Sequence, residues 1–296
     1  MRSKDLAFVA SRKRDQALRV LSTIATIGLI WAVLGVGRGN AEPANGQAVQ
    51  VDGQRVAYRV FGHERPVLVM ICGLGEGMAS FNGVASDLAE NATVIVYDHA
   101  GRRVSDEATT HRDALAVDRE LTGMLEASGI AGPYVIVGHS SGGLYTEHFA
   151  AHHPAKVADL ILEESRPADF SGRCRSAGLA MCVPPPALVR FLPKGARAEA
   201  AALDETNAEV GVLRYSAAPV LVLSRPLGKD AKGFDALWGE TQDDLAIRYG
   251  ARHLRAPAGG HNIHIDQREW FVAQVKAFLG IAGVEARAAP QRLPIN

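Results

Sequence analysis

The sequence predicts an α/β fold built on a mostly parallel, doubly wound sheet. From about residue 49 to about residue 280, short apolar runs typical of buried strands alternate with longer amphipathic runs typical of helices. Strands separated by helix-length segments pair in parallel through right-handed crossovers. With 296 residues, 47% of them hydrophobic, the chain is long enough to bury one sizeable core.

The segments before residue 130 predict a hairpin, two buried strands and one helix. Residues 49–60 alternate apolar and polar side chains around Asp52-Gly53, which is the pattern of a β-hairpin. Residues 66–71 and 92–97 are apolar runs of strand length, and residues 111–128 carry apolar side chains at helical spacing. The strand at 66–71 runs into a glycine-rich turn at residues 72–75.

The next segment predicts a sharp turn from a strand into a helix. Residues 134–137 form a buried-strand pattern, residues 138–142 read Gly-His-Ser-Ser-Gly, and apolar side chains then recur at helical spacing until Pro154. The five residues match G-x-S-x-G, in which glycines relieve a cramped backbone. Such a turn exposes the Ser140 hydroxyl as a nucleophile and directs the Ser141 backbone N–H toward an oxyanion.

Residues 138–157 resemble the nucleophile-elbow segment of the α/β-hydrolase fold superfamily, and the likeness extends from about Val49 to about Gly280. The resemblance implies a Ser-His-acid triad in that chain order. It also implies a second oxyanion N–H from the turn after the first parallel strand, which here is that of Leu74. The chain departs from the family at Cys72, where histidine is usual.

A second turn resembles a family motif that is normally structural. Residues 98–105 are similar to D-x-R-G-x-G-x-S, with departures at Ala100 and Arg103. We therefore expect His99 and Arg102 to be surface or loop-packing residues and not catalysts.

The base that activates the serine is predicted to be His261. A serine hydroxyl needs a base with a pKa near 7, which points to histidine. Residues 252–257 read as the last strand, and Gly259-Gly260-His261 follows it as in the family's G-x-G-H pattern. His264 is the competitor, but it lies where the final helix should begin, and we expect it to have a capping role there.

Two carboxylates are candidates for the acid of the triad. Glu164 ends the strand predicted at 157–164, whereas Asp230 follows the strand predicted at 219–224 and comes about two residues late. The family usually takes its acid from the second place and sometimes from the first. We favour Glu164, with Asp230 as the alternative, and Glu163 should point to the other side of the strand.

Residues 165–215 interrupt the alternation and predict a short cap over the site. A helical pattern covers residues 197–210. Cys174 and Cys182 lie in the cap, and we predict that they form a disulfide if the protein is exported, leaving Cys72 as a buried thiol.

The first 47 residues predict export or membrane anchorage. Six basic residues fall within residues 1–19, and residues 20–37 form an uncharged, mostly apolar run. This is the pattern of a signal peptide or an uncleaved anchor that keeps the basic end in the cytoplasm. We expect residues 1–47 to be this segment plus a linker. Residues 48–296 would be an α/β-hydrolase domain that is periplasmic, extracellular or anchored outside the cytoplasm.

Together these features predict a serine hydrolase, similar to carboxylesterases and lipases, that acts on a small-molecule ester or amide through an acyl-enzyme. With 32 basic and 32 acidic residues, the chain has no charge excess that would indicate nucleic-acid binding. No metal-ligand spacing or cofactor motif is apparent, so we expect neither. The alternatives are a lyase or cofactor-free peroxidase of the same fold, or a non-catalytic binding member.

Overall fold

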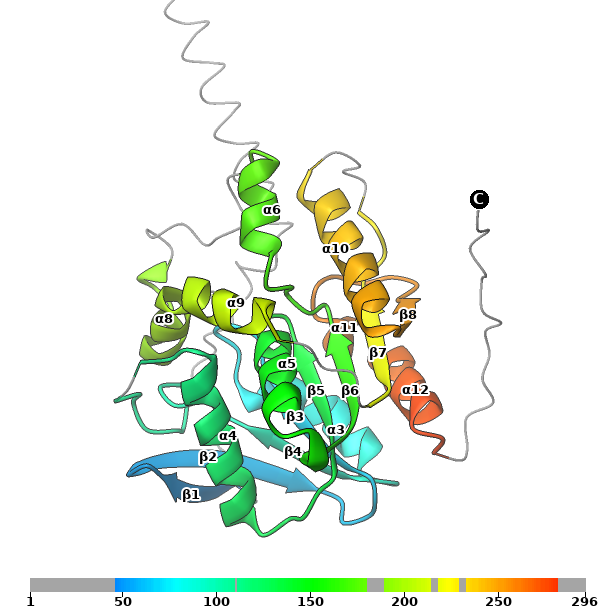
Figure 1. Cartoon of the computed structure of the whole chain (residues 1–296). Helices are drawn as coiled ribbons and strands as arrows, with labels where there is room; N and C mark the ends of the chain where they lie inside the picture. The colour runs from blue at the N-terminus through cyan, green and yellow to red at the C-terminus, as the bar shows by residue number, and fades with distance from the viewer. Residues whose placement is uncertain (1–45, 110, 180–188, 214–217, 229–232, 282–296) are drawn as a thin grey trace, which may run out of the picture. The chain divides into compact units, whose positions relative to one another are not determined.

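The computed structural model describes residues 46–109, 111–179, 189–213, 218–228 and 233–281 (Figure 1). The predicted N-terminal signal or anchor lies outside these residues. Within the described part, no helix combines the length and the apolar character needed to cross a bilayer.

A single eight-stranded sheet runs through the described domain, with the strand order β1-β2-β4-β3-β5-β6-β7-β8. The strands are β1 (Gln47–Val51), β2 (Gln54–Phe61), β3 (Val67–Ile71), β4 (Thr93–Tyr97), β5 (Tyr134–His139), β6 (Val157–Glu163), β7 (Val220–Ser224) and β8 (Arg252–Arg255). The β1–β2 and β2–β4 pairs are antiparallel, and the other neighbours are parallel. This confirms the predicted mostly parallel α/β sheet and the hairpin at its edge.

Helices cover both faces of the sheet because both faces of its central strands are apolar. Along β3, Val67, Val69 and Ile71 join one core, whereas Leu68 and Met70 join the other. The first core also receives α4 (Ala114–Ser128) and α5 (Gly142–His152), together with the C-terminal part of α10 (Phe234–Tyr249). The second receives α3 (Asn82–Leu88), α11 (Ile263–Asp266) and α12 (Arg268–Phe278). A doubly wound sheet is the result.

Between β6 and β7 the described chain forms α6 (Phe170–Ser176), α8 (Lys194–Ala201) and α9 (Leu203–Gly211). The helical run expected over residues 197–210 is therefore two helices that meet at Ala202. In Figure 1, α6 lies above the upper ends of β5 and β6, and α9 crosses the upper ends of α4 and α5.

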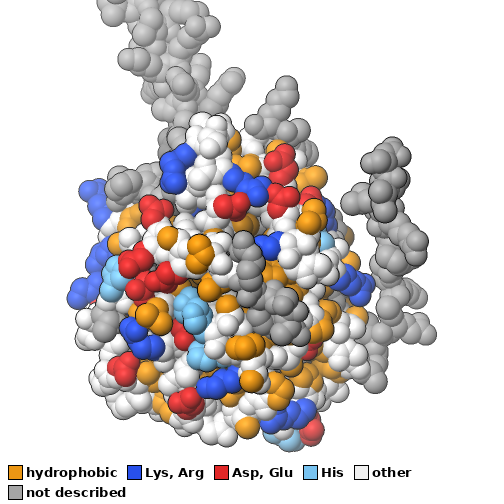
Figure 2. Space-filling view, in the orientation of Figure 1, with side chains coloured by type: hydrophobic (Ala, Val, Ile, Leu, Met, Phe, Trp, Pro, Cys, Tyr) orange, Lys and Arg blue, Asp and Glu red, His pale blue; other side chains and the backbone are white. Residues whose placement is uncertain are grey.

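Charged side chains are mixed on the visible face of the domain. In Figure 2, basic and acidic residues are interspersed over this face and do not gather into one basic stripe.

Candidate active site

Ser140 lies at the turn between the end of β5 and the start of α5. Its φ is 54°, a left-handed conformation that costs energy in a residue with a side chain. Two hydrogen bonds from neighbouring backbone hold this turn: the Ser140 N–H donates to Glu163 O at 3.1 Å, and Arg166 N–H donates to Ser140 O at 2.9 Å. The strain therefore persists because the flanking strand ends fix the turn.

The glycines of the G-x-S-x-G motif are required for close packing. A Cβ atom at Gly142 would lie 2.3 Å from the carbonyl oxygen of Ile71, and one at Gly138 would lie 2.3 Å from Thr146 Oγ1. Either side chain would push the strand and the helix apart. The sequence motif thus reflects the tight contact between β5, α5 and the end of β3.

The structure brings Ser140, His261 and Glu164 together in one chain of polar contacts. Ser140 Oγ lies 2.9 Å from His261 Nε2, and His261 Nδ1 lies 3.0 Å from Glu164 Oε2. The His261 side chain is 30% exposed, whereas Glu164 is fully buried. A hydroxyl, an imidazole and a buried carboxylate in this order can move a proton from the serine to the histidine.

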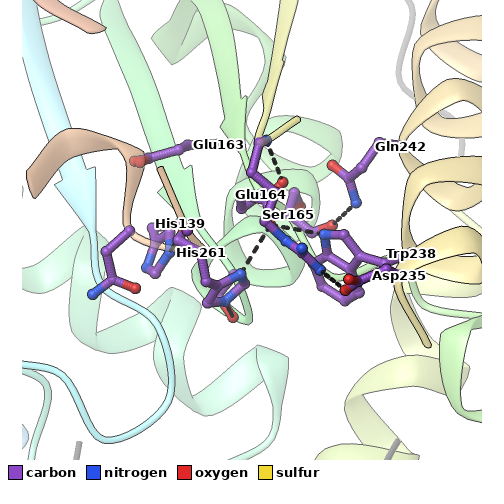
Figure 3. Close-up of polar contacts among 12 residues, drawn as sticks. His139, Glu163, Glu164, Ser165, Asp235, Trp238, Gln242 and His261 are labelled. Atoms are coloured by element: carbon purple, nitrogen blue, oxygen red, sulfur yellow. Dashed lines mark hydrogen bonds and ion pairs between the residues drawn. The ribbon is translucent and has the colours of Figure 1, made fainter. Parts of the chain in front are cut away.

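Glu164 is held by donors that the sequence analysis did not identify. Its Oε1 accepts the Arg225 backbone N–H at 2.8 Å, and its Oε2 accepts Trp238 Nε1–H at 2.8 Å and Arg225 Nε–H at 3.2 Å. The Arg225 guanidinium also contacts Asp235 at 2.8 Å. As Figure 3 shows, the Glu164 side chain lies between His261 and Trp238.

The loop after β7 contributes a cation where the acid of the family is usually found. Arg225 directly follows β7 and binds Glu164. The alternative acid, Asp230, lies outside the described residues. The only sequence signal for this arrangement was the position of Arg225 directly after a strand of the parallel sheet.

Glu163 faces the opposite side of β6 and binds His264. Its Oε1 accepts the His264 backbone N–H at 2.8 Å and lies 2.9 Å from His264 Nδ1. Burial would raise the pKa of Glu163, but His264 outweighs burial and lowers it. The expectation of a capping role for His264 was wrong: it lies buried in the short helix α11, and the final helix begins at Arg268.

A second histidine links three loops around Ser140. His139 Nδ1 lies 2.8 Å from Glu76 Oε2, and His139 Nε2 lies 3.0 Å from the carbonyl oxygen of His261. Glu76 also accepts Asn262 Nδ2–H at 2.9 Å and the Gly73 N–H at 3.2 Å. These contacts connect the elbow, the turn after β3 and the loop that carries His261.

The charge state of His139 follows from this environment. Burial would lower its pKa, but the Glu76 carboxylate raises it to about 10. For Glu76, burial would raise the pKa, but His139 outweighs burial and holds it below its ordinary value. At neutral pH, His139 is therefore a charged imidazolium that donates to both Glu76 and the backbone of His261.

Two backbone N–H groups are free to bind an oxyanion. Leu74 lies in the turn after β3, and Ser141 is the residue that precedes α5. Within the described chain, neither N–H donates to a protein acceptor. A Cβ atom at Gly73 would lie 3.0 Å from Ser140 Cβ, so the turn lies directly beside the serine. The amino end of α5 adds a positive dipole there.

A buried glutamate connects the cap to the turn after β4. Glu199, on α8, contacts His99 Nδ1 at 3.0 Å and the Arg102 guanidinium. Arg102 Nη1 also donates to the carbonyl oxygens of Gly73 and Glu76 at 2.6 Å each. His99 and Arg102 are thus buried loop-packing residues, and they join the cap to the turn that carries Leu74.

Two groups of described residues have ligand atoms close enough to hold a metal ion. One comprises His139, Glu163 and His264, and the other comprises His111, Asp113 and Glu205. In the first group, His139 and Glu163 already hydrogen-bond protein partners through their side chains, and the second group is largely exposed. Neither group includes Ser140 or His261.

The cysteines follow the predicted pattern as far as they are described. Cys174, on α6, is disulfide-bonded, and Cys72 is free and buried. Cys182, the predicted partner of Cys174, lies outside the described residues. Burial raises the pKa of the Cys72 thiol, so this thiol is not activated.

The amino-acid sequence was compared with protein-family models and with known proteins. Residues 66–191 match a family model described as alpha/beta hydrolase fold. An uncharacterized protein of Mycobacterium tuberculosis is 35% identical over 112 residues, which cover 38% of this chain and 32% of that protein. The putative carbamate hydrolase RutD of Azorhizobium caulinodans is 29% identical over 119 residues, covering 40% of this chain and 44% of that one. The matches thus span less than half the length of these relatives.

Solved structures share the fold over most of the chain. An enol-lactonase from Burkholderia xenovorans superposes with a TM-score of 0.62 at 20% identity, covering 79% of this chain and 100% of that one. A thermophilic esterase from Thermogutta terrifontis gives a TM-score of 0.63 at 20% identity, covering 80% and 98%.

Proposed function

Because this chain belongs to the α/β-hydrolase fold superfamily, we propose that it is a serine hydrolase that cleaves an ester or amide bond through an acyl-enzyme. The observation that carries the proposal is the contact series from Ser140 Oγ through His261 to Glu164, at 2.9 Å and 3.0 Å. The carbamate hydrolase, the lactonase and the esterase named above are all hydrolases, which supports the general class of reaction.

In this mechanism, Ser140 Oγ attacks the substrate carbonyl carbon while His261 Nε2 accepts the hydroxyl proton. Glu164 stabilises the imidazolium that forms and keeps the His261 Nδ1–H directed toward itself. The N–H groups of Leu74 and Ser141 hold the negative oxygen of the tetrahedral intermediate. His261 then protonates the leaving alcohol or amine.

Deacylation repeats these steps with water. His261 removes a proton from the water, which attacks the acyl carbonyl, and then returns the proton to Ser140 Oγ. The free carboxylate product and the original enzyme result, so the cycle is balanced without any oxidant or further group.

The proposal is tested with Ser140→Ala. We expect hydrolysis of short p-nitrophenyl esters to fall by at least about a thousandfold, because the nucleophile is lost. Ser128→Ala is the control: at the end of α4, the Ser128 Oγ–H donates to Leu125 O, and Oγ accepts the Ile130 N–H. A fluorophosphonate probe should label the wild type at Ser140 and leave Ser140→Ala unlabelled. Full activity of a folded Ser140→Ala protein would refute the assignment.

A further inference from the structure

Arg166 is a buried cation that adjoins the nucleophile. It follows β6 by three residues, and its backbone N–H donates to Ser140 O at 2.9 Å. Only 8% of the residue is exposed. Its backbone therefore adjoins the nucleophile, and its side chain is not a surface charge.

The guanidinium has no carboxylate partner among the described residues. Its Nη2 donates to Ser171 Oγ at 2.5 Å, its Cζ lies 5.0 Å from the ring centre of Phe170, and its buried Nε has no acceptor. Asp204 raises the pKa of Arg166 through its charge, but the two side chains form no ion pair in the described part of the chain. Burial lowers the pKa of Arg166 to about 10, still far above neutrality, so the group is charged at pH 7.

Two other fully buried arginines are neutralised by glutamates. Arg102 contacts Glu199, and Arg112 lies 2.8 Å from Glu120. A buried guanidinium without a counter-ion is unfavourable, and a carboxylate is the partner that its planar fork fits best. Arg166 is therefore prepared for an anion that the described residues do not supply.

An aromatic wall joins Arg166 to the catalytic histidine. Phe170, which stacks with Arg166, lies edge-on to Trp238 at 4.8 Å, and Trp238 lies 5.5 Å from the His261 ring. A substrate chain that passes along this wall would meet apolar rings near the reacting carbonyl and a cation farther away.

We propose that Arg166 binds a carboxylate of the substrate, so that the preferred substrates are esters whose acyl chain ends in a carboxylate. This rests on the proposed serine hydrolase function. The acyl carbonyl would lie at Ser140, the methylene chain against Phe170 and Trp238, and the carboxylate at the guanidinium of Arg166, as a bidentate pair.

The proposed role of Arg166 in binding a substrate carboxylate depends on its position beside Ser140 and not on its burial alone. Arg59 on β2 is also buried at 6% exposure and has no carboxylate partner in the described segments. Its Nη1 donates to Asn82 Oδ1 at 3.3 Å, and Asn82 lies at the start of α3. Among the described residues, Arg59 makes no hydrogen bond or ion pair with Ser140, His261 or the aromatic wall. It provides a matched control for the loss of a buried guanidinium.

The test compares monomethyl esters of succinate, glutarate and adipate with methyl butyrate, methyl valerate and methyl hexanoate. At one chain length, we expect the wild type to prefer the anionic ester by at least about tenfold in kcat/KM. Arg166→Met should reduce that preference to about one while changing kcat/KM for the neutral ester much less. Arg166→Lys should keep part of the preference, because it keeps the charge but not the fork.

Arg59→Met should leave the preference unchanged, even if it lowers the melting temperature. If Arg166→Met does not fold, the partial loss of preference expected in Arg166→Lys carries the test. Labelling of Ser140 by the fluorophosphonate without a preference for anionic esters at any length would overturn the role of Arg166 and leave the serine hydrolase intact. An equal loss for both ester types in folded Arg166→Met would also overturn it. Absence of labelling would overturn both proposals.

Discussion

Glu164 and Glu163 are adjacent glutamates, each bound to a histidine, which makes them a stringent test of the site. We predict that Glu164→Gln lowers kcat by about a thousandfold to ten-thousandfold, the cost of replacing the acid of a Ser-His-Asp triad by its amide. This corresponds to about 4–5 kcal/mol of lost transition-state stabilisation. Glu163→Gln should change kcat by less than about tenfold, since its partner His264 does not contact Ser140.

The magnitude for Glu164→Gln follows from its partners. Oε2 faces three N–H donors, on His261, Trp238 and Arg225, and Oε1 faces the backbone N–H of Arg225. An amide has one oxygen, so one of these positions must receive an NH₂ group that faces other donors. If the NH₂ faces His261, the imidazole is held in the tautomer whose Nε2 carries the proton and cannot accept one from the serine.

The assay is steady-state hydrolysis of a p-nitrophenyl ester, with active protein counted by fluorophosphonate titration and folding checked by thermal melting. Glu163→Gln keeps an oxygen that can accept both donors of His264, so we expect it to fold. Equal losses for the two variants would refute the reasoning. A small effect of Glu164→Gln would mean that another acid completes the triad, and Asp230→Asn would then be the next variant to test.

Three further predictions concern the surroundings of the site. Trp238→Phe removes one N–H from Glu164 and should lower kcat by roughly tenfold with little change in the melting temperature, because one hydrogen bond to a charged group is lost. Glu199→Gln leaves the buried Arg102 without its carboxylate and should lower the free energy of unfolding in urea by about 3–5 kcal/mol; no change would contradict the anchoring role. Burial raises the pKa of Glu147 from 4.5 to about 7, so the folded state holds a proton that the unfolded chain releases. Wild-type stability should then fall between about pH 4.5 and pH 7 by up to about 3 kcal/mol, and Glu147→Gln should remove this fall in urea titrations at pH 5 and pH 8.

The sheet and the elbow could be predicted because their signals are local. Strand-length apolar runs, helical periodicity and the G-x-S-x-G motif depend on residues that are close in the sequence. His261 was also predictable, since a glycine-rich loop after the last strand has few alternatives. The contact between Ser140 and His261 spans 121 residues, but it follows from the strand order alone.

The support of the site could not be predicted because it depends on contacts between distant loops. Arg225 and Trp238 carry no motif, and each acquires its role only when β7 and α10 are placed beside β6. The charge of His139 depends on Glu76, which is 63 residues away. His264 was misassigned for the same reason, because its partner Glu163 lies 101 residues earlier in the chain.

The register of two neighbouring strands explains why β6 supplies the carboxylate. His139 on β5 pairs with Glu163 on β6, so Ser140 and Glu164 are the next residues of both strands at the same edge of the sheet. Both leave the sheet in a left-handed conformation, with φ of 54° and 45°. The two strands thus turn together, and the serine and the carboxylate are directed toward the same imidazole. If β6 were shifted by one residue relative to β5, the two glutamates would exchange places. Glu163 would then face His261, and Glu164 would lie in the core.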